Sequence, residues 1–98
     1  MGFFNSMRTI GEINALLKDF ENQVTITQGQ VGSGASKATL NNSLNVMKSI
    51  HQQLIDKFGN SSVARTATYT IFGDKMRMDG ILTYTKNVIY NLYAIINS

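Results

Sequence analysis

Apolar residues recur at steps of three and four along most of this chain, which is the spacing of one face of an α-helix. The first such stripe lies between residues 3 and 27, and most of the charged residues there fall off it. Its members are Phe3, Met7, Ile10, Ile13, Leu17, Phe20 and Val24. The pattern predicts one long helix over residues 3–27.

A second stripe follows a glycine- and serine-rich segment at residues 29–37, which we expect to be a loop that reverses the chain. Ser36 has the side chain of a helix N-cap, and Gly59-Asn60 tolerate the backbone of a helix C-terminus. The apolar positions between them are Leu40, Leu44, Met47, Ile50, Leu54 and Phe58. A second helix is predicted over residues 37–58.

The segment after residue 60 has two interpretations. In the helical one, a short helix covers residues 62–72, Gly73 ends it, and a last helix covers 74–97. In the other, β-branched residues such as Thr66, Thr68 and Thr70 form a β-hairpin within residues 66–84. We favour the helical interpretation because a third stripe begins inside the second strand that the hairpin would need. The stripe consists of Met78, Leu82, Thr85, Ile89, Leu92 and Ile96.

The predicted fold is therefore all-α, an antiparallel bundle of three long helices plus one short helix in a single domain, residues 1–98. The alternative is an α+β fold with the hairpin at 66–84. Ile81, Val88 and Ile95 widen the stripe of the last helix into a broad apolar face. Such a helix is central in a bundle or covered by another subunit.

Composition narrows the possible functions. The chain has no cysteine, which excludes disulfides and cysteine-ligated metal sites, and no proline, which suits long helices. Only 15% of residues are charged, and the net charge of +3 arises after Gly34. We see no signal peptide and no apolar run long enough to span a membrane, so we expect a cytoplasmic protein, with signal-less secretion left open.

No pattern of catalytic or cofactor-binding residues is present. Gly29 and Gly34 have the glycine spacing of a phosphate-binding loop, but Ala35 stands where that motif needs lysine. His51 is the single histidine, without a neighbouring acid to orient it or a second metal ligand. We therefore predict no catalytic residue, no metal, no cofactor, no small-molecule substrate and no enzymatic activity.

Two surfaces are candidates for binding. Four basic residues, Lys57, Arg65, Lys75 and Arg77, bracket the predicted short helix and form a possible patch for anions or an acidic partner. A possible apolar interface comprises Phe3 and Phe4 near the start of the chain and Tyr90 and Tyr93 in the last helix. Tyrosine is common at interfaces because it buries a large ring and keeps a polar tip.

These features favour a small, non-catalytic helical interaction module that associates with itself, as a homodimer or larger, or with another protein. One alternative is a peripheral binder of nucleic acid or a membrane surface through the basic patch. Another is a helical bundle of bacterial immunity or secretion systems, an alternative that depends only on analogy at the level of the fold.

Overall fold

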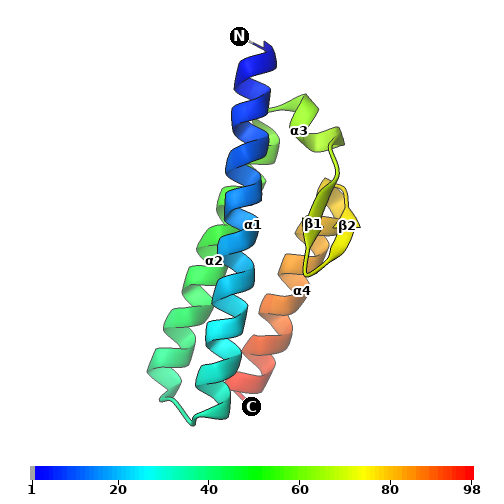
Figure 1. The fold of residues 1–98 in the computed structure, drawn as a ribbon. Helices are drawn as coiled ribbons and strands as arrows, with labels where there is room; N and C mark the ends of the chain where they lie inside the picture. Colours follow the sequence, from blue (N-terminus) through cyan, green and yellow to red (C-terminus); the bar gives the residue numbers. More distant parts are fainter. Residues whose placement is uncertain (1) are drawn as a thin grey trace.

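The computed structural model describes the backbone of residues 2–98 and the side chains of residues 5–98. Four helices and a two-stranded hairpin make up this part of the chain (Figure 1). In order they are α1 (Gly2–Gly32), α2 (Lys37–Gly59), α3 (Ser62–Thr66), β1 (Tyr69–Ile71), β2 (Asp74–Met76) and α4 (Met78–Ile96). The fold is thus predominantly helical, as the apolar stripes predict.

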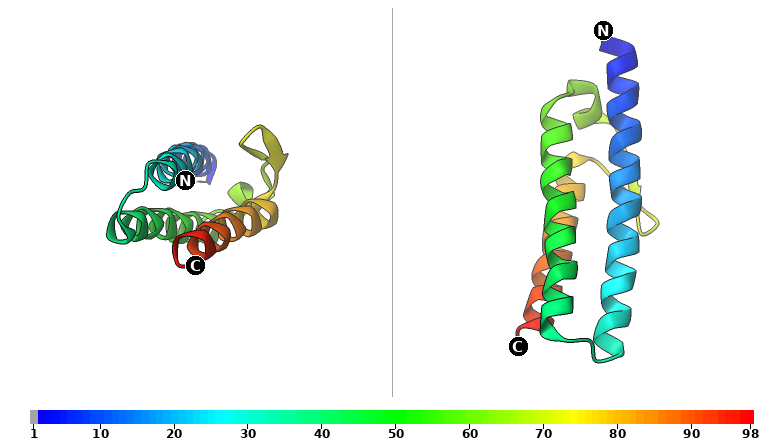
Figure 2. Two further views of the ribbon diagram at one scale, coloured as in Figure 1. Left: turned by 90° about the horizontal axis from the view of Figure 1, so that it is seen from below. Right: turned by 90° about the vertical axis from the view of Figure 1, so that its left-hand side faces the viewer.

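Helix α2 is the central element. It runs antiparallel to both α1 and α4 and packs against each of them, whereas α1 and α4 make few direct contacts with one another (Figures 1 and 2). At about 1.5 Å per residue the 31 residues of α1 span roughly 46 Å, which accounts for the 48 Å long axis of the molecule. The arrangement leaves α4 with one side toward α2 and another toward α1 and the hairpin.

The core consists of the predicted stripes. Its largest fully buried side chains include Phe20, Phe58, Ile13, Leu17, Leu44, Met47, Leu54, Ile71 and Ile81. Residues from α1, α2, β1 and α4 meet in this one cluster. The periodicity of three and four therefore identified most buried positions of the long helices, whereas Met7 of the first stripe is 56% exposed.

The first helix is longer than predicted, since it continues past residue 27 to Gly32. The turn that ends it is set by Gly34, whose φ of +75° suits glycine. The Ala35 amide donates to the Gln30 carbonyl at 3.0 Å and the Gly34 amide donates to Val31 at 3.2 Å, the pair of bonds of a Schellman motif. The loop is consequently shorter than residues 29–37, and Ser36 caps α2 as predicted by accepting from the Thr39 amide.

The predicted helix over residues 62–72 is wrong beyond Thr66. Residues 69–76 instead form an antiparallel hairpin in which Tyr69 pairs with Met76 and Ile71 with Asp74. Tyr69 fixes this geometry, because its buried ring meets Phe58 edge-on at 5.5 Å and its hydroxyl donates to the Ala64 carbonyl at 2.8 Å. Tertiary packing of alternate residues thus outweighs the helical spacing of this segment.

The alternative interpretation correctly predicted a β-hairpin, but its range of residues 66–84 is too long. Helix α4 begins at Met78, before the end of the predicted hairpin at residue 84. It also begins later than the helical interpretation placed it, at residue 74, because Asp74–Met76 belong to β2. The N-cap position of the last helix is Arg77. Both interpretations therefore placed this boundary a few residues away from its true position.

Candidate functional site

Two hollows flank α4, and they are the candidate binding sites of the described residues. One lies between α4, α1 and the hairpin, with a volume of about 500 Å³, and we call it the apolar groove. The other lies between α4 and α2, with a volume of about 630 Å³, and we call it the cationic cleft. The two belong to different sides of one helix and are built from different chemistry.

The apolar groove has no charged side chain in its lining. Its walls are Val24 and Gln28 of α1, Phe72 of the hairpin turn, and Tyr84, Val88, Asn91, Leu92 and Ile95 of α4. Leu92 and Val24 are buried at its base, while Ile95 and Phe72 remain 56% and 42% exposed at its edges. A wide apolar surface on this side of α4 is therefore left uncovered by the chain itself.

Phe72 enters the groove from an unfavourable backbone conformation. It shares the two-residue turn with Gly73, and the two φ angles of 48° and 82° identify a type I′ turn. Glycine and asparagine favour such positions, whereas a residue with a large β-substituent is strained there. The turn is held by the Phe72 amide, which donates to Glu21 Oε2 of α1 at 2.6 Å, and by the Tyr84 ring, 6.1 Å from the Phe72 ring.

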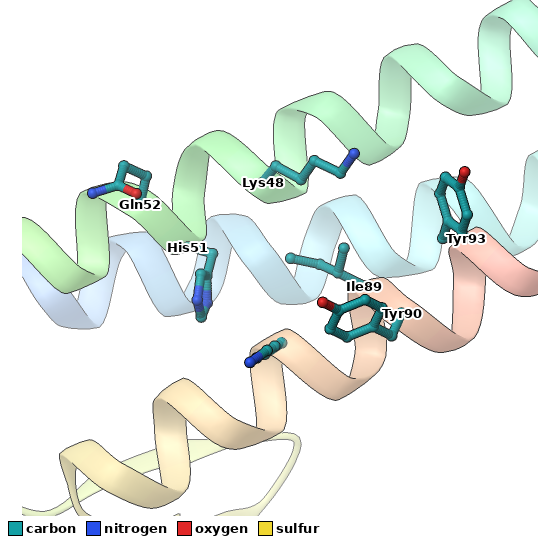
Figure 3. Close-up of a pocket in the computed structure, with 7 residues that line it drawn as sticks. Lys48, His51, Gln52, Ile89, Tyr90 and Tyr93 are labelled. Carbon is teal, nitrogen blue, oxygen red and sulfur yellow. The ribbon is translucent and has the colours of Figure 1, made fainter.

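The cationic cleft collects side chains from two helices (Figure 3). Helix α2 contributes Lys48, His51 and Gln52, and α4 contributes Lys86, Ile89, Tyr90 and Tyr93. On each helix these residues are three or four positions apart and thus share one face. The lining contains two ammonium groups and no carboxylate, which gives the cleft a positive potential.

Each lysine of the cleft lies over a tyrosine ring. Lys48 Nζ of α2 is 5.7 Å from the Tyr93 ring centroid, so this pair bridges the two helices, and Lys86 Nζ is 5.9 Å from the Tyr90 ring. Such contacts between exposed groups are weak, about 0.5–1 kcal/mol. They hold the ammonium groups beside the rings without neutralising them.

His51 is fixed by a bond across the helix interface. Its Nδ1 lies 2.7 Å from Thr85 Oγ1, and the Thr85 hydroxyl in turn donates to the Ile81 carbonyl at 3.0 Å. Because the single proton of the Thr85 hydroxyl is assigned to the Ile81 carbonyl, we assign Nδ1–H as the donor to Oγ1, which leaves the lone pair on Nε2. Burial first, and the Lys86 charge second, lower the pKa of His51, so the ring is neutral at pH 7.

The predicted basic patch is dispersed over several elements. Lys57 Nζ of α2 pairs with Glu12 Oε1 at 3.2 Å, and Arg65 Nη1 of α3 donates to the carbonyls of Phe58 and Gly59 at the end of α2. Lys75 is exposed on β2 and Arg77 is exposed just before α4. Two of the four thus make intramolecular interactions, and anion binding by this set stays a prediction.

The predicted apolar interface is only partly described. The side chains of Phe3 and Phe4 lie outside the described residues. Tyr90 and Tyr93 are exposed, as an interface requires, but they line the cationic cleft and not the apolar groove. Tyr90 and Tyr93 thus lie in a hollow together with charged side chains, and an interface through them stays a prediction.

The remaining cleft residues escaped the sequence interpretation. The sequence shows no acid or metal ligand beside His51, and nothing in it distinguishes Lys48 and Lys86 from other lysines. A signal existed in the i, i+3, i+4 spacing of Lys48, His51 and Gln52. Only the packing of α2 on α4, however, brings this face opposite Lys86, Tyr90 and Tyr93.

Comparison of the chain with family models, curated proteins and solved structures finds no match. None of the helices in the described part of the chain has the length and apolar character needed to cross a membrane. Within that part, no three histidine, aspartate or glutamate side chains gather as metal ligands would. The case for function therefore depends on the two hollows.

Proposed function

We propose that this protein is a non-catalytic helical interaction module that associates with itself through the apolar groove. In the dimer, α1 and α4 of one copy pack against the same helices of a second copy and complete an antiparallel helix bundle. The observation that carries the proposal is the open groove between α1 and α4, whose lining is apolar or uncharged.

The first support is the free energy of exposed apolar surface. Burial of apolar area stabilises by about 25 cal/mol per Å², and contiguous exposed patches on soluble proteins commonly mark interaction sites. Ile95 and Phe72 lie at the two ends of the groove and are largely accessible. A partner that covers both residues and the wall between them gains from each.

The second support is the residue at the hairpin turn. A non-glycine residue with positive φ costs on the order of 1–3 kcal/mol, and asparagine or glycine would relieve part of it at Phe72. The protein nevertheless places a large ring there, bound through its amide to Glu21 and aimed at the groove beside Tyr84. Burial of the Phe72 ring in an interface would offset the free energy of this backbone strain.

Charge and symmetry favour a second copy as the occupant. In a two-fold symmetric dimer the same surface of both copies forms the interface, so like charges in the lining would face one another and repel. The apolar groove has none, whereas the cationic cleft would oppose lysines to lysines. Because α1 and α4 run parallel to each other, a perpendicular two-fold axis also makes every contact between copies antiparallel.

The test is the mass in solution, measured by light scattering behind a sizing column over a range of protein concentrations at low and high salt. We expect a dimer whose dissociation constant changes little with salt, because the contact is apolar. Ile95→Glu should raise that constant at least about 100-fold, since each dimer would bury two unpaired carboxylates.

Ile26→Glu is the matched control. Ile26 is 51% exposed, close to the 56% of Ile95, but it lies two residues beyond Val24 and hence about 200° around α1 from the groove. The control should dimerise like the original chain. A monomer at every concentration, or equal weakening by both variants, would remove the proposal.

A further inference from the structure

The cationic cleft combines open aromatic rings with uncompensated positive charge, and we propose that it binds a nucleotide unit. The base would lie against the tyrosine rings and the phosphate beside the ammonium groups of Lys48 and Lys86. This site is on the other side of α4 from the apolar groove, so it is independent of the proposed dimer.

The charges select an anion. Lys48 and Lys86 reach the cleft from opposite helices, and none of its lining residues is acidic. On α2 the nearest acid beyond the lining is Asp56, which accepts a bond from the Gln52 amide at 3.1 Å and so lies at one end. Two like charges at the walls of a hollow focus the potential on the space between them.

The rings select a flat ligand. Tyr90 and Tyr93 are exposed and three residues apart, so both project from one side of α4. Proteins that bind single-stranded nucleic acid combine basic grooves with such rings, because every base has a face that stacks. Each lysine here lies beside a ring, so the cleft offers positive charge and stacking surface next to one another.

His51 adds a hydrogen-bond acceptor to the lining of the cleft. With Nδ1–H donated to Thr85, the free lone pair is on Nε2. A ribose hydroxyl or a base N–H can donate to it. Figure 3 shows His51 projecting from α2 toward α4 within the lining. The full set of groups therefore suits a nucleoside phosphate better than a bare anion.

The size is consistent with this ligand. Small-molecule sites commonly have volumes of about 300–1,000 Å³ with a mainly apolar lining and a few polar groups. The cleft has about 630 Å³ and Ile89 as an apolar residue among its polar ones. The nucleotide unit can come as a free nucleotide or as part of a single strand, and the two sources share the chemistry.

The experiment is a calorimetric titration of the full chain at low salt with AMP, adenosine, inorganic phosphate and a short single-stranded oligoadenylate. We expect AMP to bind saturably and more tightly than adenosine or phosphate. An oligoadenylate that exceeds AMP by more than its number of units would identify a strand as the source, and parity per unit would identify the free nucleotide.

Variants assign the binding to the cleft. Lys48→Gln and Lys86→Gln should each weaken AMP binding about five- to tenfold, and Tyr90→Ala should weaken it to a similar degree. Lys75→Gln removes an exposed lysine on β2 and should have no effect. All four positions are exposed, so the variants should fold.

Three outcomes would overturn the proposal. They are the absence of saturable binding of AMP and the oligonucleotide, phosphate binding as tight as AMP binding, and an equal loss in Lys75→Gln and the cleft variants. The last two would show that the anions bind through the overall positive charge of the surface and not through the groups of the cleft. None of them bears on the mass measurement, so failure here is distinguishable from failure of the proposed dimer.

Discussion

The apolar groove and the cationic cleft share one helix yet differ in the residues that an occupant would meet. The groove takes Val88, Leu92 and Ile95 from α4, while the cleft takes Lys86, Tyr90 and Tyr93. These sets interleave along the sequence and separate only because a helix advances about 100° per residue. A single 19-residue helix thus presents an uncharged, largely apolar surface to the groove and a positively charged one to the cleft.

The two hollows also differ in how firmly they are built. The cleft is formed by two long helices joined through the His51–Thr85 bond and the Lys48–Tyr93 contact. The groove depends on a hairpin with strands of only three residues, whose turn is strained and tied to α1 by one hydrogen bond to Glu21. Changes in the hairpin should therefore alter the groove and leave the cleft unchanged.

The largest effect is expected at the base of the groove. Leu92→Ala removes a side chain that is 7% exposed and part of the core, and it should lower the free energy of unfolding by about 2–3 kcal/mol. Ile95→Ala, one turn away at the edge, should change it by less than about 0.5 kcal/mol. Urea denaturation of both variants tests this, and equal losses would mean that the edge is as well packed as the base.

The hairpin turn should give the next largest effect. Gly73→Ala puts a β-carbon on a residue with φ of +82° and open space around it, so backbone strain alone decides the result. We expect a loss of about 1 kcal/mol in the free energy of unfolding. Gly29→Ala is the control, because Gly29 also has open space around it but lies within α1, where alanine is favoured. A neutral Gly73→Ala would show that the turn relaxes.

Sequence periodicity predicted the long helices and their buried faces because each stripe is a local property. The stretch from Thr66 to Met78 resisted prediction because its helical spacing and its strand alternation are equally good locally. The outcome depends on Tyr69, whose partners Phe58 and Ala64 lie five and more residues away. The β-branched residues Thr66, Thr68 and Thr70 favoured a strand, but this local preference alone could not decide between strand and helix without those contacts.

The candidate sites were predictable only in part for a similar reason. The broad apolar face of α4, with Ile81, Val88 and Ile95, was visible and indicated a helix that is central in a bundle or covered by another subunit. That the chain itself buries Ile81 and leaves Ile95 exposed is a property of the packing, as is the meeting of Lys48 with Tyr93 across two helices. Conversely, Lys57 and Arg65 resembled a binding patch because sequence does not show their partners, Glu12 and the end of α2.

A substitution at Phe72 should separate stability from assembly. Phe72→Asn places a residue that tolerates positive φ at the turn and should raise the free energy of unfolding of the monomer by roughly 0.5–1 kcal/mol. It also removes the ring from the groove, so the same variant should weaken the dimer. Denaturation at low concentration and light scattering at high concentration measure the two effects. A variant that strengthens both would show that the ring has no part in the interface.

The smallest effect expected is a pH dependence confined to the cleft. Burial and Lys86 lower the pKa of His51 in the folded chain below its ordinary 6.5. Between the folded pKa and 6.5, the unfolded chain therefore binds more protons than the folded chain. The contribution of His51 to stability is therefore constant above about pH 6.5 and declines as the pH falls toward its folded pKa. Around the ring, Lys48 of α2 and Lys86 of α4 are the cations of the lining, whose other side chains with ionisable groups are those of Tyr90 and Tyr93.

Lys86→Met should raise the pKa of His51 without restoring it to 6.5, because burial is the larger cause and remains. His51 is the single histidine of the chain, so its ring protons report the titration in an NMR spectrum without ambiguity. Lys75→Met, outside the cleft, should leave the titration unchanged, and so should Ile95→Glu in the groove. If Ile95→Glu moved the pKa as much as Lys86→Met, the two sides of α4 would be electrostatically joined, and their separation by helical spacing alone would not hold.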